Sequence, residues 1–161
     1  GARQSLGVAR QGFFVSMGGF DTHNEQRGEH AQRLAELANG LAAFQRAMEA
    51  IAVADQVTAF ALSDLGRTFR INANAGTDHA WGSPQLVLGG GVRGGAFYGR
   101  FPDLAIGGPD DVSGDGAFIP SVAVEQMGAT LARWFGVPAN ALPQVFPNLA
   151  AFPVADLGFL G

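Results

Sequence analysis

Two of the three histidines in this sequence of 161 residues stand beside aspartates, in the clusters Asp21-Thr22-His23 and Asp78-His79. A carboxylate and an imidazole two residues apart in a turn can both face one ion. The adjacent Asp78 and His79 can converge on one metal or on two neighbouring ones, or one can bind while the other orients it. Zinc, manganese and iron accept oxygen and nitrogen ligands of this kind. The two clusters therefore indicate a metal site.

A further carboxylate, Asp64, ends an apolar run and is followed closely by Arg67. If the run is a strand of an open α/β sheet, Asp64 lies at the edge where such sheets bind ligands. The planar guanidinium of Arg67 suits the oxygens of phosphate or sulfate. Asp64 is thus a candidate for the same site and Arg67 for binding an oxyanion. The alternative is an ion pair between the two residues in a turn.

Each cluster also has an explanation that needs no metal. Asp21 could cap the helix that follows it, because aspartate is a common N-cap, with His23 bonded to a neighbour. Asp78 and His79 could belong to an ordinary polar loop. The third histidine, His30, falls inside a predicted helix, where we expect a surface or interface position.

Two other segments resemble known sites only superficially. The run Gly89–Gly95 lacks the Gly-Lys-Ser/Thr ending and the following helix of a phosphate-binding loop. The aspartates at 110, 111 and 115 lack the twelve-residue spacing and the terminal glutamate of a calcium loop. We assign a ligand to neither segment.

A βαβ unit is predicted to position the candidate residues. Residues 12–17 form an apolar, aromatic and β-branched run that ends at two glycines, which is typical of a buried strand. Apolar residues at helical spacing predict a helix over 29–51, and residues 57–63 form a second strand-like run. Strands joined by one helix are parallel. Their carboxyl ends, near Asp21 and Asp64, should therefore meet at one edge of the sheet.

The rest of the chain is expected to be mostly loop with one more helix. Residues 66–84 contain several breakers, and residues 85–88 and 96–101 could be short strands. A helix is predicted from Ser121, a suitable N-cap, to residue 135, where glycine and then proline follow in the usual order.

Composition limits the class of protein. The chain is 47% hydrophobic and only 15% charged, so it can form a core, and part of its surface could pack against further polypeptide. A net charge of −4 gives no basic footprint for nucleic acid. The absence of cysteine excludes thiolate ligands. The longest apolar run, residues 50–54, is too short to span a membrane. The first residue is glycine, which suggests a processed, trimmed or incomplete chain.

Four segments in order resemble one family: residues 18–26, 63–68, 76–82 and 88–95. The family is domain of unknown function 1501, a large group of uncharacterised bacterial proteins placed in the alkaline phosphatase and sulfatase superfamily. The resemblance extends roughly from Val8 to Phe152. It implies a single partial domain over residues 1–161, the C-terminal half of a three-layer α/β/α sandwich with a mainly parallel sheet.

The resemblance also implies the site. Asp21 and His23 look like one ligand pair, and Asp64 looks like the aspartate that ends a central strand, with Leu65 at the position of a usual histidine. The implied metal ligands are Asp21, His23, Asp64, Asp78 and His79. The implied cofactor is a divalent metal such as zinc, manganese or calcium.

By the same resemblance, the whole protein would be exported, often by the twin-arginine route, to the periplasm or cell surface. It would hydrolyse phosphate or sulfate esters. The superfamily nucleophile and first metal aspartate lie in the N-terminal half, which this sequence lacks. We therefore expect the missing N-terminal segment to be a partner, and the 161 residues alone to be inactive.

Two alternatives to the hydrolase fragment stay open. The chain could be a non-catalytic binding or structural module, because Ser83-Pro84-Gln85 stands where family members often carry histidines. It could also be a half-protein that assembles with a separate chain. The sequence does not fix the oligomeric state.

Overall fold

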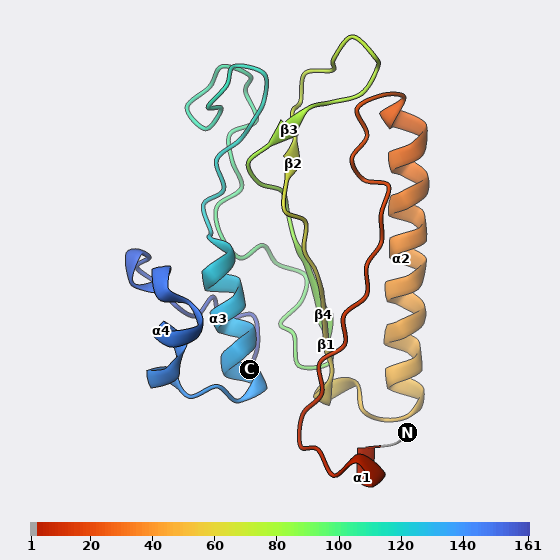
Figure 1. The fold of residues 1–161 in the computed structure, drawn as a ribbon, viewed down its shortest axis with the longest axis vertical. Coiled ribbons are helices and arrows are strands. Elements are labelled where there is room, and N and C mark those ends of the chain that lie inside the picture. Colours follow the sequence, from red (N-terminus) through yellow and green to blue (C-terminus); the bar gives the residue numbers. More distant parts are fainter. Residues whose placement is uncertain (1–2) are drawn as a thin grey trace.

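The computed structural model describes residues 3–161, with side chains from residue 5 onward. The strands lie between helix α2 on one side and helices α3 and α4 on the other (Figure 1). The helices are α1 (Arg3–Leu6), α2 (Gln26–Ala50), α3 (Val124–Phe135) and α4 (Leu142–Val145). The strands are β1 (Thr58–Ala61), β2 (Gly66–Arg67), β3 (His79–Ala80) and β4 (Leu86–Gly89). The 3₁₀ turns are η1 (Ala54–Gln56), η2 (Ala139–Ala141) and η3 (Pro147–Ala151).

The predicted parallel-sheet sandwich is wrong. The named strands of the described chain form two separate antiparallel pairs, β1 with β4 and β2 with β3. In the first pair Thr58 lies opposite Gly89 and Ala61 opposite Leu86. The segment after β1 therefore folds back and returns as β4. A strand pattern shows which residues can pair but not with which partner. Here β1 pairs with β4 and not with residues 12–17.

Residues 12–17 do not form the predicted strand. They run alongside α2 in the same direction as β1, but the described residues show no strand or ladder there (Figure 1). The side chains of Phe13, Phe14 and Val15 are 86%, 93% and 88% exposed. Consecutive apolar residues on an extended chain point to opposite faces, so both faces of this segment are uncovered. The predicted strand over 96–101 is absent as well from the described chain.

Both long helices are confirmed, with differences at their ends. Helix α2 begins at Gln26 and ends at Ala50, yet none of its residues is buried, so its apolar stripe faces no core. Helix α3 begins later than predicted. Ala123 is its N-cap, and its N–H donates to Oε1 of Gln126 at 2.9 Å. Ser121 instead bonds the backbone of Arg100. Helix α3 ends at a left-handed glycine, as expected.

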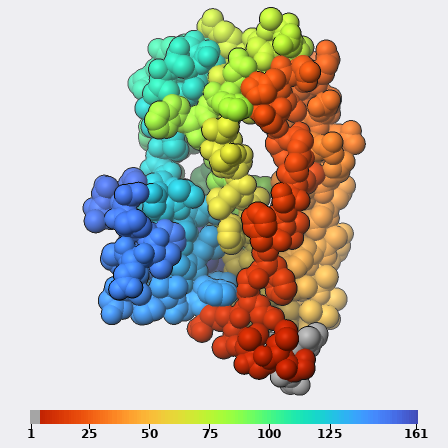
Figure 2. Space-filling view, in the orientation of Figure 1, coloured from red at the N-terminus to blue at the C-terminus, as the bar shows by residue number. Residues whose placement is uncertain are grey.

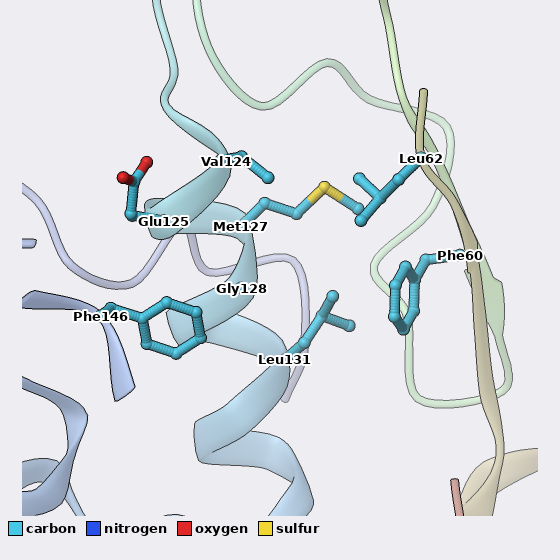
Figure 3. Close-up of a pocket in the computed structure, with 8 residues that line it drawn as sticks. All are labelled: Phe60, Leu62, Val124, Glu125, Met127, Gly128, Leu131 and Phe146. Atoms are coloured by element: carbon cyan, nitrogen blue, oxygen red, sulfur yellow. The ribbon is translucent and has the colours of Figure 1, made fainter. Parts of the chain in front are cut away.

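The packed core is small and lies around α3. Ala129 of α3 is fully buried against Leu142 and Leu149. Beside this core, an apolar cavity of about 380 Å³ separates α3 from Phe60 and Leu62, whose side chains point toward the helix (Figure 3). None of the described helices is both long and apolar enough to cross a membrane.

Two aspartates organise the loop between β4 and α3. Asp110 accepts two bonds from Arg100, at 2.6 and 2.7 Å, and one from the N–H of Asp103 at 2.7 Å. Asp111 accepts bonds from five backbone N–H groups, those of residues 107, 113, 114, 116 and 117. These carboxylates hold the loop through its own backbone, which explains their spacing without a calcium ion.

We expect this loop to loosen in acid. The Arg100 guanidinium lowers the pKa of Asp110 from 3.8 to about 2, and the N–H of Gly107, with other backbone N–H groups, lowers the pKa of Asp111 as well. A pKa lowered by folding adds stability above the unfolded value, and this stability is lost as the pH falls through the folded value. The protection factors of the amides over residues 107–117 should fall relative to those of helix α3 as the pH falls from about 4 to about 2. Unchanged relative protection would contradict this assignment.

A candidate metal centre

The β2–β3 pair places two candidate side chains on one face. Arg67 of β2 lies directly opposite His79 of β3. Directly opposite residues of an antiparallel pair project to the same side of the sheet. The chain just after β3 passes very close to Gly66, where an added Cβ would lie 2.1 Å from the carbonyl oxygen of Gly82. Glycine at position 66 leaves room for this approach.

The segment that carries Asp21 and His23 is fixed against the loop before β3. Asn24 forms an isolated antiparallel bridge with Ala75, and the N–H of Thr77 donates to the carbonyl of Thr22 at 3.2 Å. Both threonines are buried. Because the side chain of Thr22 points into the protein, the side chains of its neighbours, Asp21 and His23, point toward solvent.

Three ligand atoms meet at the centre of this arrangement. Oδ1 of Asp21 lies 2.9 Å from Nε2 of His23 and 2.9 Å from Nε2 of His79. The two Nε2 atoms are 3.1 Å apart. Ligands about 2.1 Å from one ion lie about 3.0 Å apart at octahedral angles and about 3.4 Å apart at tetrahedral angles, so the spacing is close to that around a single ion. This metal-type group of Asp21, His23 and His79 is called the triad below.

Asp78 lies behind the triad. Its Oδ1 is 3.2 Å from Nδ1 of His23 and accepts a bond from Nδ2 of Asn72 at 3.2 Å. These bonds, from Asn72 first and then His23, lower the pKa of Asp78. A carboxylate at Nδ1 keeps the proton there, so the lone pair of Nε2 faces the triad. Of the two roles considered for Asp78, the geometry favours orienting a ligand.

Asn72 ties the loop together, although its sequence position indicated only a breaker. Its Nδ2 donates to the carbonyl of His23 at 2.9 Å as well as to Asp78. Its Oδ1 accepts the N–H groups of Asn74 and Gly76, at 2.9 and 3.0 Å. An asparagine whose side chain bonds the backbone two residues on is a known turn former, which was the available signal.

The remaining candidates have different positions. Asp64 lies in an exposed bend after β1 and forms no hydrogen bond or ion pair with any residue that the structure describes, so it does not pair with Arg67. Asp21 does not cap α2, whose N-cap is Glu25. His30 contacts the ring of Phe20 with centroids 6.1 Å apart, away from the triad members.

The triad is open to water. The side chains of Asp21, His23 and His79 are 68%, 46% and 49% exposed. The hydrogen bond from His79 and then that from Arg67 lower the pKa of Asp21, so this carboxylate is ionised at neutral pH. The centre thus offers one negative oxygen and two imidazole nitrogens at an accessible surface.

Comparisons with known proteins agree with the sequence resemblance only at the level of the family. Neither a curated protein nor a solved structure is significantly similar to this chain. The sequence profile of a family described as "protein of unknown function (DUF1501)" matches residues 1–142. Since this match covers most of the 161 residues, the chain belongs to the DUF1501 family.

Proposed function

We propose that this chain binds one divalent transition metal through the triad, and that the site serves the hydrolysis of phosphate or sulfate esters. The meeting of Oδ1 of Asp21 with the two Nε2 atoms, within 2.9–3.1 Å of one another, carries the proposal. Two imidazoles and a carboxylate suit zinc, manganese or iron. Calcium, the third ion implied by the resemblance, fits less well because it prefers oxygen ligands throughout.

The chain's own residues would prepare such a site. His23 and His79 would each offer Nε2 as a ligand atom, and Asp78 keeps the His23 ring in its orientation. Asp21 supplies the negative charge. When bound, a divalent ion would polarise an ester oxygen of the substrate and so favour attack on the phosphorus or sulfur. Asp64 has no part in the triad, and we propose no role for it.

A partner segment is a second part of the proposal. The triad side chains are too exposed to exclude water, and electrostatic catalysis is strongest where water is excluded. The space-filling view shows an opening between the segment before α2, in red, and the region of β1, in yellow (Figure 2). Apolar side chains of residues 12–17 are exposed, and so are Leu34 and Phe44 of α2.

We propose that further polypeptide covers these surfaces in the complete protein. The DUF1501 resemblance supports an N-terminal segment as the source, and it supports export to the periplasm. The 161 residues then lack the nucleophile that an ester hydrolase needs.

The test is metal titration followed by assay of the same sample. The chain, first treated with chelator, is titrated with Zn²⁺ and Mn²⁺ by calorimetry. It is then supplied with p-nitrophenyl phosphate and p-nitrophenyl sulfate. We expect binding of a single ion and turnover of neither ester. Failure to bind either ion would refute the metal site. Robust turnover that Asp21→Ala abolishes would refute the view that the chain is incomplete.

A further inference from the structure

Each of the three nitrogens of Arg67 donates a hydrogen bond to the protein. Its Nε donates to Oγ1 of Thr77 at 3.1 Å, and its Nη2 donates to the carbonyl of Thr77. Its Nη1 donates to Oδ1 of Asp21 at 2.6 Å. The Arg67 side chain is only 16% exposed. A guanidinium held at all three nitrogens is a fixed cation and is poorly placed to reach out to a substrate oxyanion.

The residues that Arg67 contacts also hold the segments that carry the triad. Thr77 is buried, and its N–H bonds the carbonyl of Thr22, the residue between Asp21 and His23. Arg67 also lies opposite His79 in the β2–β3 pair. The arginine therefore connects the strand of one histidine with the carboxylate that must meet both histidines.

We infer that Arg67 is a positioning residue, which holds Oδ1 of Asp21 at the triad, and that it does not bind the substrate oxyanion. The inference rests on the proposed metal site. Asp21 is 68% exposed, and the protein groups that hold its oxygen are the two imidazoles and Arg67. Without Arg67, the carboxylate would lose the shortest of these contacts and turn more freely in solvent.

Two effects of Arg67 on metal affinity oppose each other. Its bond to Asp21 prepares a ligand, and loss of such an outer partner costs about 10–100-fold in affinity. Its positive charge repels a cation, but solvent around the exposed triad screens that repulsion. We therefore expect the positioning effect to dominate.

The experiment measures Zn²⁺ affinity for the unaltered chain, Arg67→Met, Arg67→Lys and Thr77→Val. Arg67→Met should weaken binding by about 10–100-fold. Arg67→Lys should weaken it nearly as much, because an ammonium cannot donate in the fixed planar geometry of the guanidinium. Thr77→Val removes the bond to Nε and should weaken binding by less. Arg70→Met is the matched control, since the side chain of Arg70 has no hydrogen bond or ion pair within the described residues.

A double-mutant cycle separates positioning from general damage. In an Asp21→Ala background, Arg67→Met should change Zn²⁺ affinity by less than about twofold, because residues that act through one contact are not additive. A full loss in that background would overturn the inference, and so would tighter binding by Arg67→Met. The same holds if Arg67→Met leaves Zn²⁺ affinity unchanged but abolishes binding of inorganic phosphate. No Zn²⁺ binding by the unaltered chain would overturn the proposed function as well.

Discussion

Replacement of His79 by alanine is expected to lower the affinity of the chain for Zn²⁺ by more than about 100-fold. This is more than the loss of a residue that only holds a metal ligand in place. His79 supplies one of only two nitrogens in the triad, and its Nε2 lies 2.9 Å from Oδ1 of Asp21 and 3.1 Å from Nε2 of His23. With it gone, one imidazole and one carboxylate remain. Calorimetry with Zn²⁺ measures the loss directly.

The third histidine provides the control. His30 belongs to α2, outside the triad, and its ring contacts Phe20. His30→Ala should therefore bind Zn²⁺ as the unaltered chain does. Equal losses in both variants would mean that the metal binds any exposed histidine. Retained affinity in His79→Ala would show that the triad does not hold the ion.

Replacement of Gly76 by alanine is expected to separate the two halves of the site. A Cβ at this position would lie 2.1 Å from the carbonyl carbon of His23 and 2.4 Å from the N–H nitrogen of Asn24. Backbone atoms cannot yield as a flexible side chain can, so the segment of residues 22–24 must move away. We expect a loss of about 1–3 kcal/mol in stability, the usual result of overpacking. Zn²⁺ affinity should fall by more than about 100-fold, because two of the triad members move together.

Gly94 is the matched position for this test. A Cβ there would meet nothing within 4 Å, and its φ is not in the left-handed region. Gly94→Ala should leave both the unfolding temperature and the Zn²⁺ affinity unchanged. If Gly76→Ala kept its affinity while losing stability, the ligand group would not depend on the close contact between the loop and residues 22–24.

Local features were predictable from the sequence, and pairing was not. The periodicity of apolar residues located α2 and α3 to within a few residues, because helices depend on contacts close in sequence. The apolar run at 57–63 located β1, but nothing in it indicated β4 as its partner. Residues 12–17 have the composition of a buried strand, yet they have no strand beside them in the described chain.

The site residues were brought together by a different route from the predicted one. Asp21 and Asp64 were expected to meet at the carboxyl ends of parallel strands, and Asp64 instead lies outside the triad. His79 reaches Asp21 through the β2–β3 pair and through the loop held by Asn72. That loop depends on side-chain bonds to the backbone, which a pattern of apolar and polar residues does not encode.

The exposed segment at Phe13, Phe14 and Val15 favours aggregation. An uncharged, β-prone run without proline is the type of sequence that nucleates amyloid stacking when it is left in water. Protein edges of this kind are normally blunted by charge, by proline or by a covering element, and none of these is present over residues 12–17. We therefore expect the chain to resist aggregation and proteolysis in a cell only if further polypeptide covers residues 12–17 quickly.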